Sequence, residues 1–124
     1  MSLGYAIGEE IPSGAIAIAE VNLSHIKNNP AHADAAIQEI GKLGDTVFIS
    51  YLPKIIIEVN RGGNDPDMVM AILACSSRLG TILIKSDFDA ISGLVDKKNE
   101  DHVVYYNSML KKQKYLDILS KSTP

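Results

Sequence analysis

Three charged side chains, Glu20, Glu58 and Lys85, are the residues of this 124-residue chain that could carry out acid–base chemistry together. Two carboxylates at close range share a proton unequally, and a nearby ammonium group favours the ionised form of one of them. Such a pair could serve as general acid and general base. The three residues are far apart in the sequence, so they meet only if the fold brings them together.

A second candidate is a glycine turn that precedes an expected helix. Its residues are Arg61, Gly62, Gly63 and Asn64. Successive backbone amides before a helix can bind an anion, and the arginine would add positive charge. The turn lacks the lysine and the Ser or Thr of a P-loop, and it has a single pair of glycines. Asp65 and Asp67 would repel a phosphate, so the favoured interpretation is a tight corner in which Asp65 caps the next helix.

The sequence predicts no metal site and no cofactor. His25, His32 and His102 have no metal-ligand spacing. The single cysteine, Cys75, lies in an apolar helical pattern, so it is expected to be a buried thiol in a reducing compartment. No nucleophile elbow typical of a hydrolase is present.

The predicted order of elements is strand, helix, strand, strand, helix, strand. Strands are expected near residues 14–25, 46–51, 55–60 and 81–87, and helices near 29–44 and 65–80. Alternation and β-branched residues favour the strands, and Pro53 marks a hairpin between the middle two. This order is typical of a ferredoxin-like βαββαβ sandwich, an α+β fold in which two helices cover one face of an antiparallel sheet. An open parallel α/β sheet is the alternative.

That domain is expected to span residues 1–96, with residues 97–124 as a C-terminal helical extension. A short helix that begins near Asp87 or Asp89 is predicted just before the extension. The apolar residues of the extension are distributed all round a helical wheel. A helix that grips another subunit would explain this distribution, and so would a helix break near Asn107.

On the predicted sheet, the side chains that point away from the helices form one face of mixed character. Its polar members are Glu20, Asn22, Ser50, Glu58, Asn60 and Lys85, and its apolar members are Phe48, Ile18, Ile56 and Leu83. Glu20 and Glu58 would lie on neighbouring strands, which would bring the acid–base pair together. The apolar members favour a subunit interface or a ligand site over plain exposure to water, which stays open as a third interpretation.

The order of elements resembles that of several small assembly-forming modules: amino-acid-sensing regulatory domains, nitrogen-signalling trimers and shell proteins of bacterial microcompartments. The similarity to shell proteins rests on the Ala-rich stretch AIAIAEV…ADAAIQEIGK and on the run IIIEVNRGG before an apolar helix. The resemblance concerns topology, and it assigns no functional residue in this chain.

Charge is unevenly distributed along the chain, whose net charge is -3. Residues 1–96 contain six Lys or Arg against twelve Asp or Glu, whereas residues 97–124 contain six Lys against three acids. An acidic body argues against nucleic acid as a partner. No apolar run is long enough for a membrane span, and residues 1–10 lack a signal-peptide pattern, so a cytoplasmic location without a membrane partner is expected.

Together these observations predict a small homo-oligomeric binding or regulatory module, whose main partner is itself and whose ligand is a small molecule of unknown identity. One alternative is a small enzyme that uses Glu20, Glu58 and Lys85. The other is a structural, self-assembling protein of the shell type. The choice leans away from an enzyme because the chain has few candidate catalytic groups.

Overall fold

Helices make up all the regular structure in the computed structural model, which describes residues 11–122. They are α1 (Ser13–Asn28), the 3-10 helix η1 (Pro30–His32), α2 (Ala33–Gly41), α3 (Asp45–Arg61), α4 (Pro66–Ser77), α5 (Lys85–Ser92) and α6 (Glu100–Ser122). No β-strand occurs between residues 11 and 122. The predicted α+β ferredoxin-like sandwich with its antiparallel sheet is therefore wrong, and so is the parallel α/β alternative. The sequence leaves open whether residues 1–10 add a further strand, and these residues fall outside the described part of the chain.

Helix α3 takes the place of the predicted hairpin, and its burial pattern explains why. The buried side chains recur at helical spacing: Val47, Phe48, Tyr51, Leu52, Ile55, Ile56 and Val59. This period of 3.6 residues places them all on one stripe, whereas a strand would bury every second residue. The intrinsic preference of isoleucine and phenylalanine for strands is worth only about 1 kcal/mol, which burial of a whole stripe outweighs.

Pro53 lies inside α3 and does not end it. Proline removes one backbone hydrogen bond of the helix, the one that would join residue 53 to the carbonyl of Ile49. The Pro53 ring is exposed, so it lies on the solvent side of α3, where water can bond a freed carbonyl. The proline marks the outer face of a helix, and the interpretation as a hairpin tip is corrected accordingly.

Helix α1 takes the place of the predicted first strand. Ala19 and Ile26 are buried, and Ala15 and Leu23 pack partly buried against the same core. Their spacings of four, four and three residues follow one helical face. The alternation of Ala and Ile in this stretch suggested a strand, but it puts Ile18 on the outside of a helix, where it is exposed.

The predicted fourth strand is also wrong: residues 81–84 are a loop held in place by Gln113 of α6, and residues 85–87 belong to the first turn of α5. The amide of Leu83 donates to the Gln113 side-chain oxygen at 2.8 Å, and Gln113 Nε2 donates to the Thr81 carbonyl at 3.0 Å. Backbone groups that are satisfied by a buried side chain need no neighbouring strand.

The two internal helices of the prediction are confirmed as η1 with α2 and as α4. Asp65 caps α4 by accepting hydrogen bonds from the amides of Asp67 and Met68, and Pro66 is the first helical residue. The helical character of the C-terminal part is also confirmed by α5 and α6. Helix α6 continues through residue 107, so the suggested break near Asn107 is wrong.

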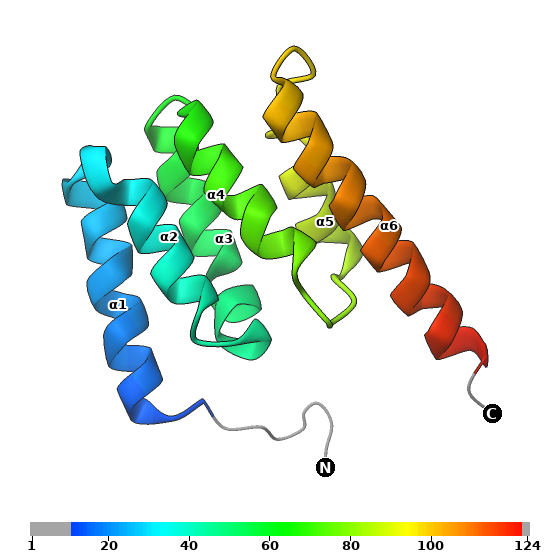
Figure 1. The fold of residues 1–124 in the computed structure, drawn as a ribbon. Helices are drawn as coiled ribbons and strands as arrows, with labels where there is room; N and C mark the ends of the chain where they lie inside the picture. Colours follow the sequence, from blue (N-terminus) through cyan, green and yellow to red (C-terminus); the bar gives the residue numbers. More distant parts are fainter. Residues whose placement is uncertain (1–10, 123–124) are drawn as a thin grey trace.

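The six α-helices form a short stack of three helical hairpins, each built from two consecutive antiparallel helices (Figure 1). Helices α1, α3 and α5 contact one another in order and form one layer, while α2, α4 and α6 form the second. One hydrophobic core runs through the stack, from Ala19 of α1 to Met109 of α6. Helices α1 and α6 therefore lie at the two ends of the stack (Figure 1).

Candidate functional site

Glu20 is the first of the predicted acid–base residues, and it pairs with α3. The Tyr51 hydroxyl donates a hydrogen bond of 2.6 Å to Glu20 Oε2. This bond raises the pKa of Tyr51 above its ordinary value, and desolvation and the charge of Glu20 act in the same direction. The carboxylate therefore joins α1 to α3.

Glu58 and Lys85 have partners of their own on other helices. Arg61 Nη1 donates to Glu58 Oε1 at 2.9 Å on α3, and Lys85 Nζ donates to Asp89 Oδ2 at 2.9 Å on α5. Tyr51, the partner of Glu20, is seven residues before Glu58, which is about 10 Å along the axis of α3. The structure thus distributes Glu20, Glu58 and Lys85 over three helices, each in a separate interaction.

The other residues of the predicted sheet face are separated as well. Phe48 is in the core and only 1% exposed, because a helical period places it with the buried stripe. Asn22 Nδ2 donates to the Ile18 carbonyl of its own helix at 2.9 Å. Ser50 and Asn60 are exposed on α3. The predicted face was assigned from the two-residue period of side chains along a strand, and a helix does not have this period. These side chains therefore do not form one surface.

A hollow of about 290 Å³ lies beside the corner between α3 and α4 and contains part of the second candidate. Arg61 and Gly62 line it together with Lys27 of α1, Glu58 and Asp65. It offers cations and carboxylates in equal number. Arg61 is paired with Glu58, and Asp65 is engaged in capping α4.

The glycine turn itself is a helix C-cap. The Asn64 amide donates to the Val59 carbonyl at 2.9 Å, and the Gly63 amide donates to the Asn60 carbonyl at 3.0 Å. This pairing, with Gly63 at a φ of 75°, is the Schellman motif that ends many helices. Its amides bond to carbonyls of α3, so they do not point together at an anion.

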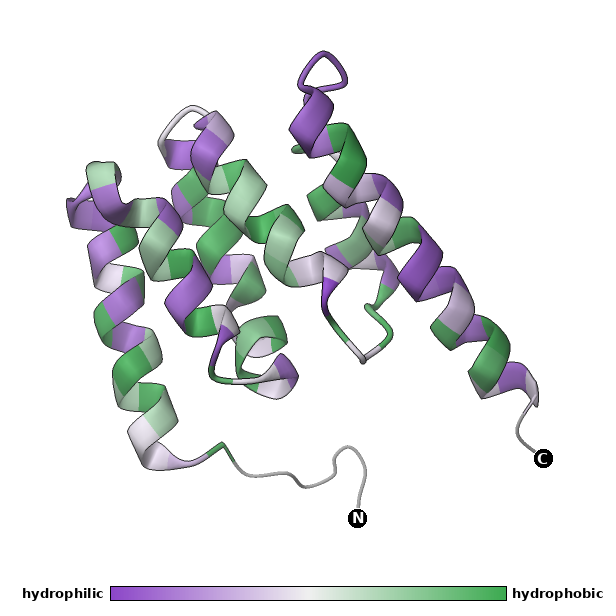
Figure 2. Cartoon of the chain, viewed as in Figure 1, coloured by the Kyte–Doolittle hydropathy of each residue, from purple (hydrophilic) through white to green (hydrophobic). Residues whose placement is uncertain are grey.

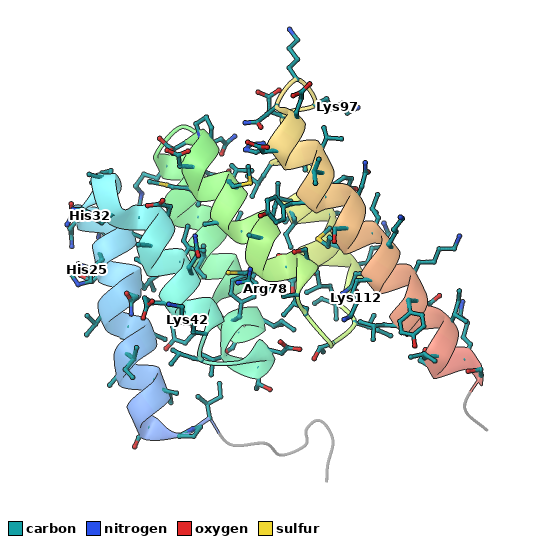
Figure 3. All side chains as sticks on the ribbon, viewed as in Figure 1. His25, His32, Lys42, Arg78, Lys97 and Lys112 are labelled. Atoms are coloured by element: carbon teal, nitrogen blue, oxygen red, sulfur yellow. The ribbon has the colours of Figure 1, made fainter. Side chains whose placement is uncertain are left out.

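Two histidines lie together at the corner between α1 and α2. His25 and His32 line a hollow of about 330 Å³ with Asn22 and Glu39, and Figure 3 shows both imidazoles at this corner. Between residues 11 and 122, no three His, Cys, Asp or Glu side chains are grouped so that they could hold a metal ion.

Two buried polar residues, His102 and Gln113, were not identified from the sequence. His102 Nε2 lies 2.9 Å from the Pro66 carbonyl, and its Nδ1 accepts a hydrogen bond from the Asp96 amide at 3.2 Å. Both join α6 to backbone of other segments. His102 is seven residues before the buried Met109 and Gln113 is four residues after it, so all three lie on the same face of α6. This helical spacing was the signal in the sequence that could have identified the two polar residues as buried.

The surface of the stack has large apolar side chains at both ends, and Figure 2 shows hydrophobic segments along the ribbons of α1 and α6. On α1 the exposed ones are Ile16, Ile18 and Val21; on α6 they are Val104, Tyr105, Leu110, Tyr115, Ile118 and Leu119. The signal in the sequence was the distribution of apolar residues around the whole wheel of α6. On α1 the exposed apolar residues were not recognised, because this segment was predicted to be a strand.

Comparison with known proteins adds no relative to this description. The chain matches no protein-family model, and no curated protein or solved structure shows significant similarity to it. Within the described part of the chain, none of the helices combines the length and the apolar character that crossing a membrane requires.

Proposed function

We propose that the protein is a self-associating binding module, built as a short stack of helical hairpins. The observation that carries this proposal is the outer face of α6. Tyr115 and Ile118 are 58% and 54% exposed, although the same helix buries His102, Met109 and Gln113 on its opposite side. A helix with apolar side chains on both sides fits one that packs on its own chain and on a partner.

The partner that we propose is another copy of the chain. The C-terminal segment of residues 97–124 has an excess of three positive charges, and residues 1–96 have an excess of six negative charges. Opposite charge on two parts of the same chain favours association between copies. A regulatory ligand would bind the assembled form. We place this module in the cytoplasm, because the free, buried thiol of Cys75 suits a reducing compartment.

The enzymatic alternative has no observation in its favour, because Glu20, Glu58 and Lys85 pair with different partners on different helices. The structural alternative, a shell-like assembly, shares the self-association and differs in having no ligand. It is separated from a binding module by ligand screening of the assembled form.

The test is the solution mass of the full chain, measured by light scattering over a concentration series. We expect an oligomer whose mass falls toward that of one chain in the Ile118→Glu variant. Ser50→Glu is the matched control, since it adds the same charge at an exposed position of α3. A wild-type chain that stays monomeric at every concentration contradicts the proposal, and loss of the oligomer in Ser50→Glu alone would move the interface to α3.

Point substitutions are preferable to removal of the C-terminal segment. Met109 and Gln113 of α6 are buried against the rest of the stack. Truncation before α6 would expose this core surface, and a change in mass would then report altered folding.

A further inference from the structure

The two end helices of the stack expose large apolar side chains, whereas the end units that normally close such an array have polar outer faces. Proteins built from stacked helical hairpins require end units with polar outer surfaces to remain soluble, since an inner unit buries both of its sides. Here the end helix α1 exposes Val21 to 56%, and the end helix α6 exposes Ile118 to 54%. Both end helices therefore share with an inner unit the apolar side chains on a second side.

The two end faces differ in shape. On the outer face of α1, Gly14 and Ala17 are small and exposed, and Ala17 lines a depression of about 230 Å³ together with the exposed side chains of Ile18 and Val21. The outer face of α6 projects large side chains, Tyr115, Ile118 and Leu119, within little more than one turn. A depression with small residues accepts large side chains better than it accepts a second depression.

The distribution of charge also favours packing of α6 on α1 over packing of α6 on α6. Lys111 and Lys112 lie on α6 between Val104 and Tyr115, and Lys112 is labelled on this helix in Figure 3. Two α6 faces packed on each other would bring lysines of both copies together, which is unfavourable. The opposite end of the stack has no lysine along α1 before Lys27. Its helices α1 and α2 carry Glu20, which bonds to Tyr51 of α3, Glu39, which pairs with Lys42, and Asp34.

We infer that the outer face of α1, formed by Ala17, Ile18 and Val21, is the docking site for the Tyr115, Ile118 and Leu119 face of α6 in a second copy. This inference rests on the proposed self-association and specifies its geometry. The contact is heterologous, with two different surfaces of the chain meeting. Repeated contacts of this kind close into a ring or extend as a filament, and a two-membered ring is the smallest closed form.

The experiment uses two full-length variants, Val21→Glu on the α1 face and Ile118→Glu on the α6 face. Each variant alone is expected to have the mass of one chain, because one of the two required faces is blocked in every copy. An equimolar mixture is expected to form a dimer and nothing larger, since the intact α6 face of Val21→Glu can bind the intact α1 face of Ile118→Glu. Light scattering and native mass spectrometry measure this gain, and Ser50→Glu again serves as the charge control.

The other outcomes separate this inference from the proposed function. If Ile118→Glu is monomeric while Val21→Glu keeps the wild-type mass, the contact is α6 on α6 and the inference is overturned, although self-association stands. Three other results also overturn the inference. In the first, Val21→Glu is monomeric while Ile118→Glu keeps the wild-type mass. In the second, both variants keep the wild-type mass, and in the third, both are monomers that do not combine on mixing. A monomeric wild-type chain overturns the proposed function as well. If circular dichroism shows that either variant is unfolded, Ala17→Glu and Tyr115→Glu replace the pair, with the same expected results.

Discussion

Gly41, the last residue of α2, lies against Cys75 of α4 at a distance that only glycine permits. A β-carbon on Gly41 would be 2.6 Å from the Cys75 sulfur and 3.4 Å from its β-carbon. Cys75 is buried in the core, and its sulfur also lies 3.7 Å from Arg78 Nη2, so a shift of the side chain would disturb other contacts. The close approach of the two helices at this point fixes how the first hairpin packs on the second.

Gly41→Ala is therefore expected to lower the free energy of unfolding by about 1–3 kcal/mol, the usual cost of overpacking a core. Urea unfolding measures this change. Gly14→Ala is the control, because a β-carbon there meets no atom within 4 Å, and it should leave stability unchanged or raise it slightly.

The cause of that loss can be tested in a double variant. In Gly41→Ala with Cys75→Ala the sulfur is absent, so most of the clash is relieved and the two substitutions should be less harmful together than the sum of their separate effects. Purely additive effects, or a Gly41→Ala variant as stable as the wild type, would contradict the contact.

The bond between Tyr51 and Glu20 leads to a prediction for Tyr51→Phe. Removing the hydroxyl leaves the Glu20 carboxylate without its 2.6 Å donor, and we expect a loss of about 0.5–1.5 kcal/mol in the free energy of unfolding near neutral pH. Denaturant unfolding measures it. Tyr105→Phe is the control, because Tyr105 lies on the outer surface of α6 and is 39% exposed.

The same pair predicts a dependence on alkaline pH. The hydrogen bond to Glu20 raises the pKa of Tyr51 in the folded state. A group with a raised folded pKa contributes its full stability below its unfolded pKa and loses it as the pH rises through the folded value. The wild-type advantage over Tyr51→Phe should thus be constant near neutral pH and shrink above the ordinary titration range of tyrosine. An advantage that grows in that range would contradict the assignment.

The sequence predicted the helices whose ends are chemically marked. Asp65 and Pro66 identify the start of α4, and Pro30 identifies the turn before α2, because caps and proline act locally. Helices α1 and α3 were missed because composition was weighed above period. The seven buried side chains of α3 follow a helical spacing without exception, and a count of that spacing would have identified the helix.

The error in the fold also determined the error in the site. Faces assigned by a period of two placed Glu20, Phe48 and Glu58 on one surface, whereas the helical period buries Phe48 and gives the carboxylates separate partners. The corner at Gly63 depends only on neighbouring residues, and the structure shows it as a C-cap. Long-range ties such as Gln113 to the α4–α5 loop depend on tertiary packing, which local patterns do not contain.

Gln113 gives the last prediction, because one side chain satisfies two backbone groups of a loop that has no partner strand. Gln113→Met keeps the length of the side chain and removes its polar atoms, so the buried amide of Leu83 loses its acceptor and the carbonyl of Thr81 its donor. Leaving one buried donor unsatisfied costs about 1–3 kcal/mol, and urea unfolding should show a loss of this size. The control is Gln38→Met, since Gln38 is exposed on α2 and the same change should there be within about 0.5 kcal/mol of the wild type. Hydrogen exchange of the Leu83 amide is a second measurement, and we expect it to be slow in the wild type and faster in Gln113→Met. Equal stability of the two variants, with unchanged exchange at Leu83, would mean that the loop is held by its own apolar contacts.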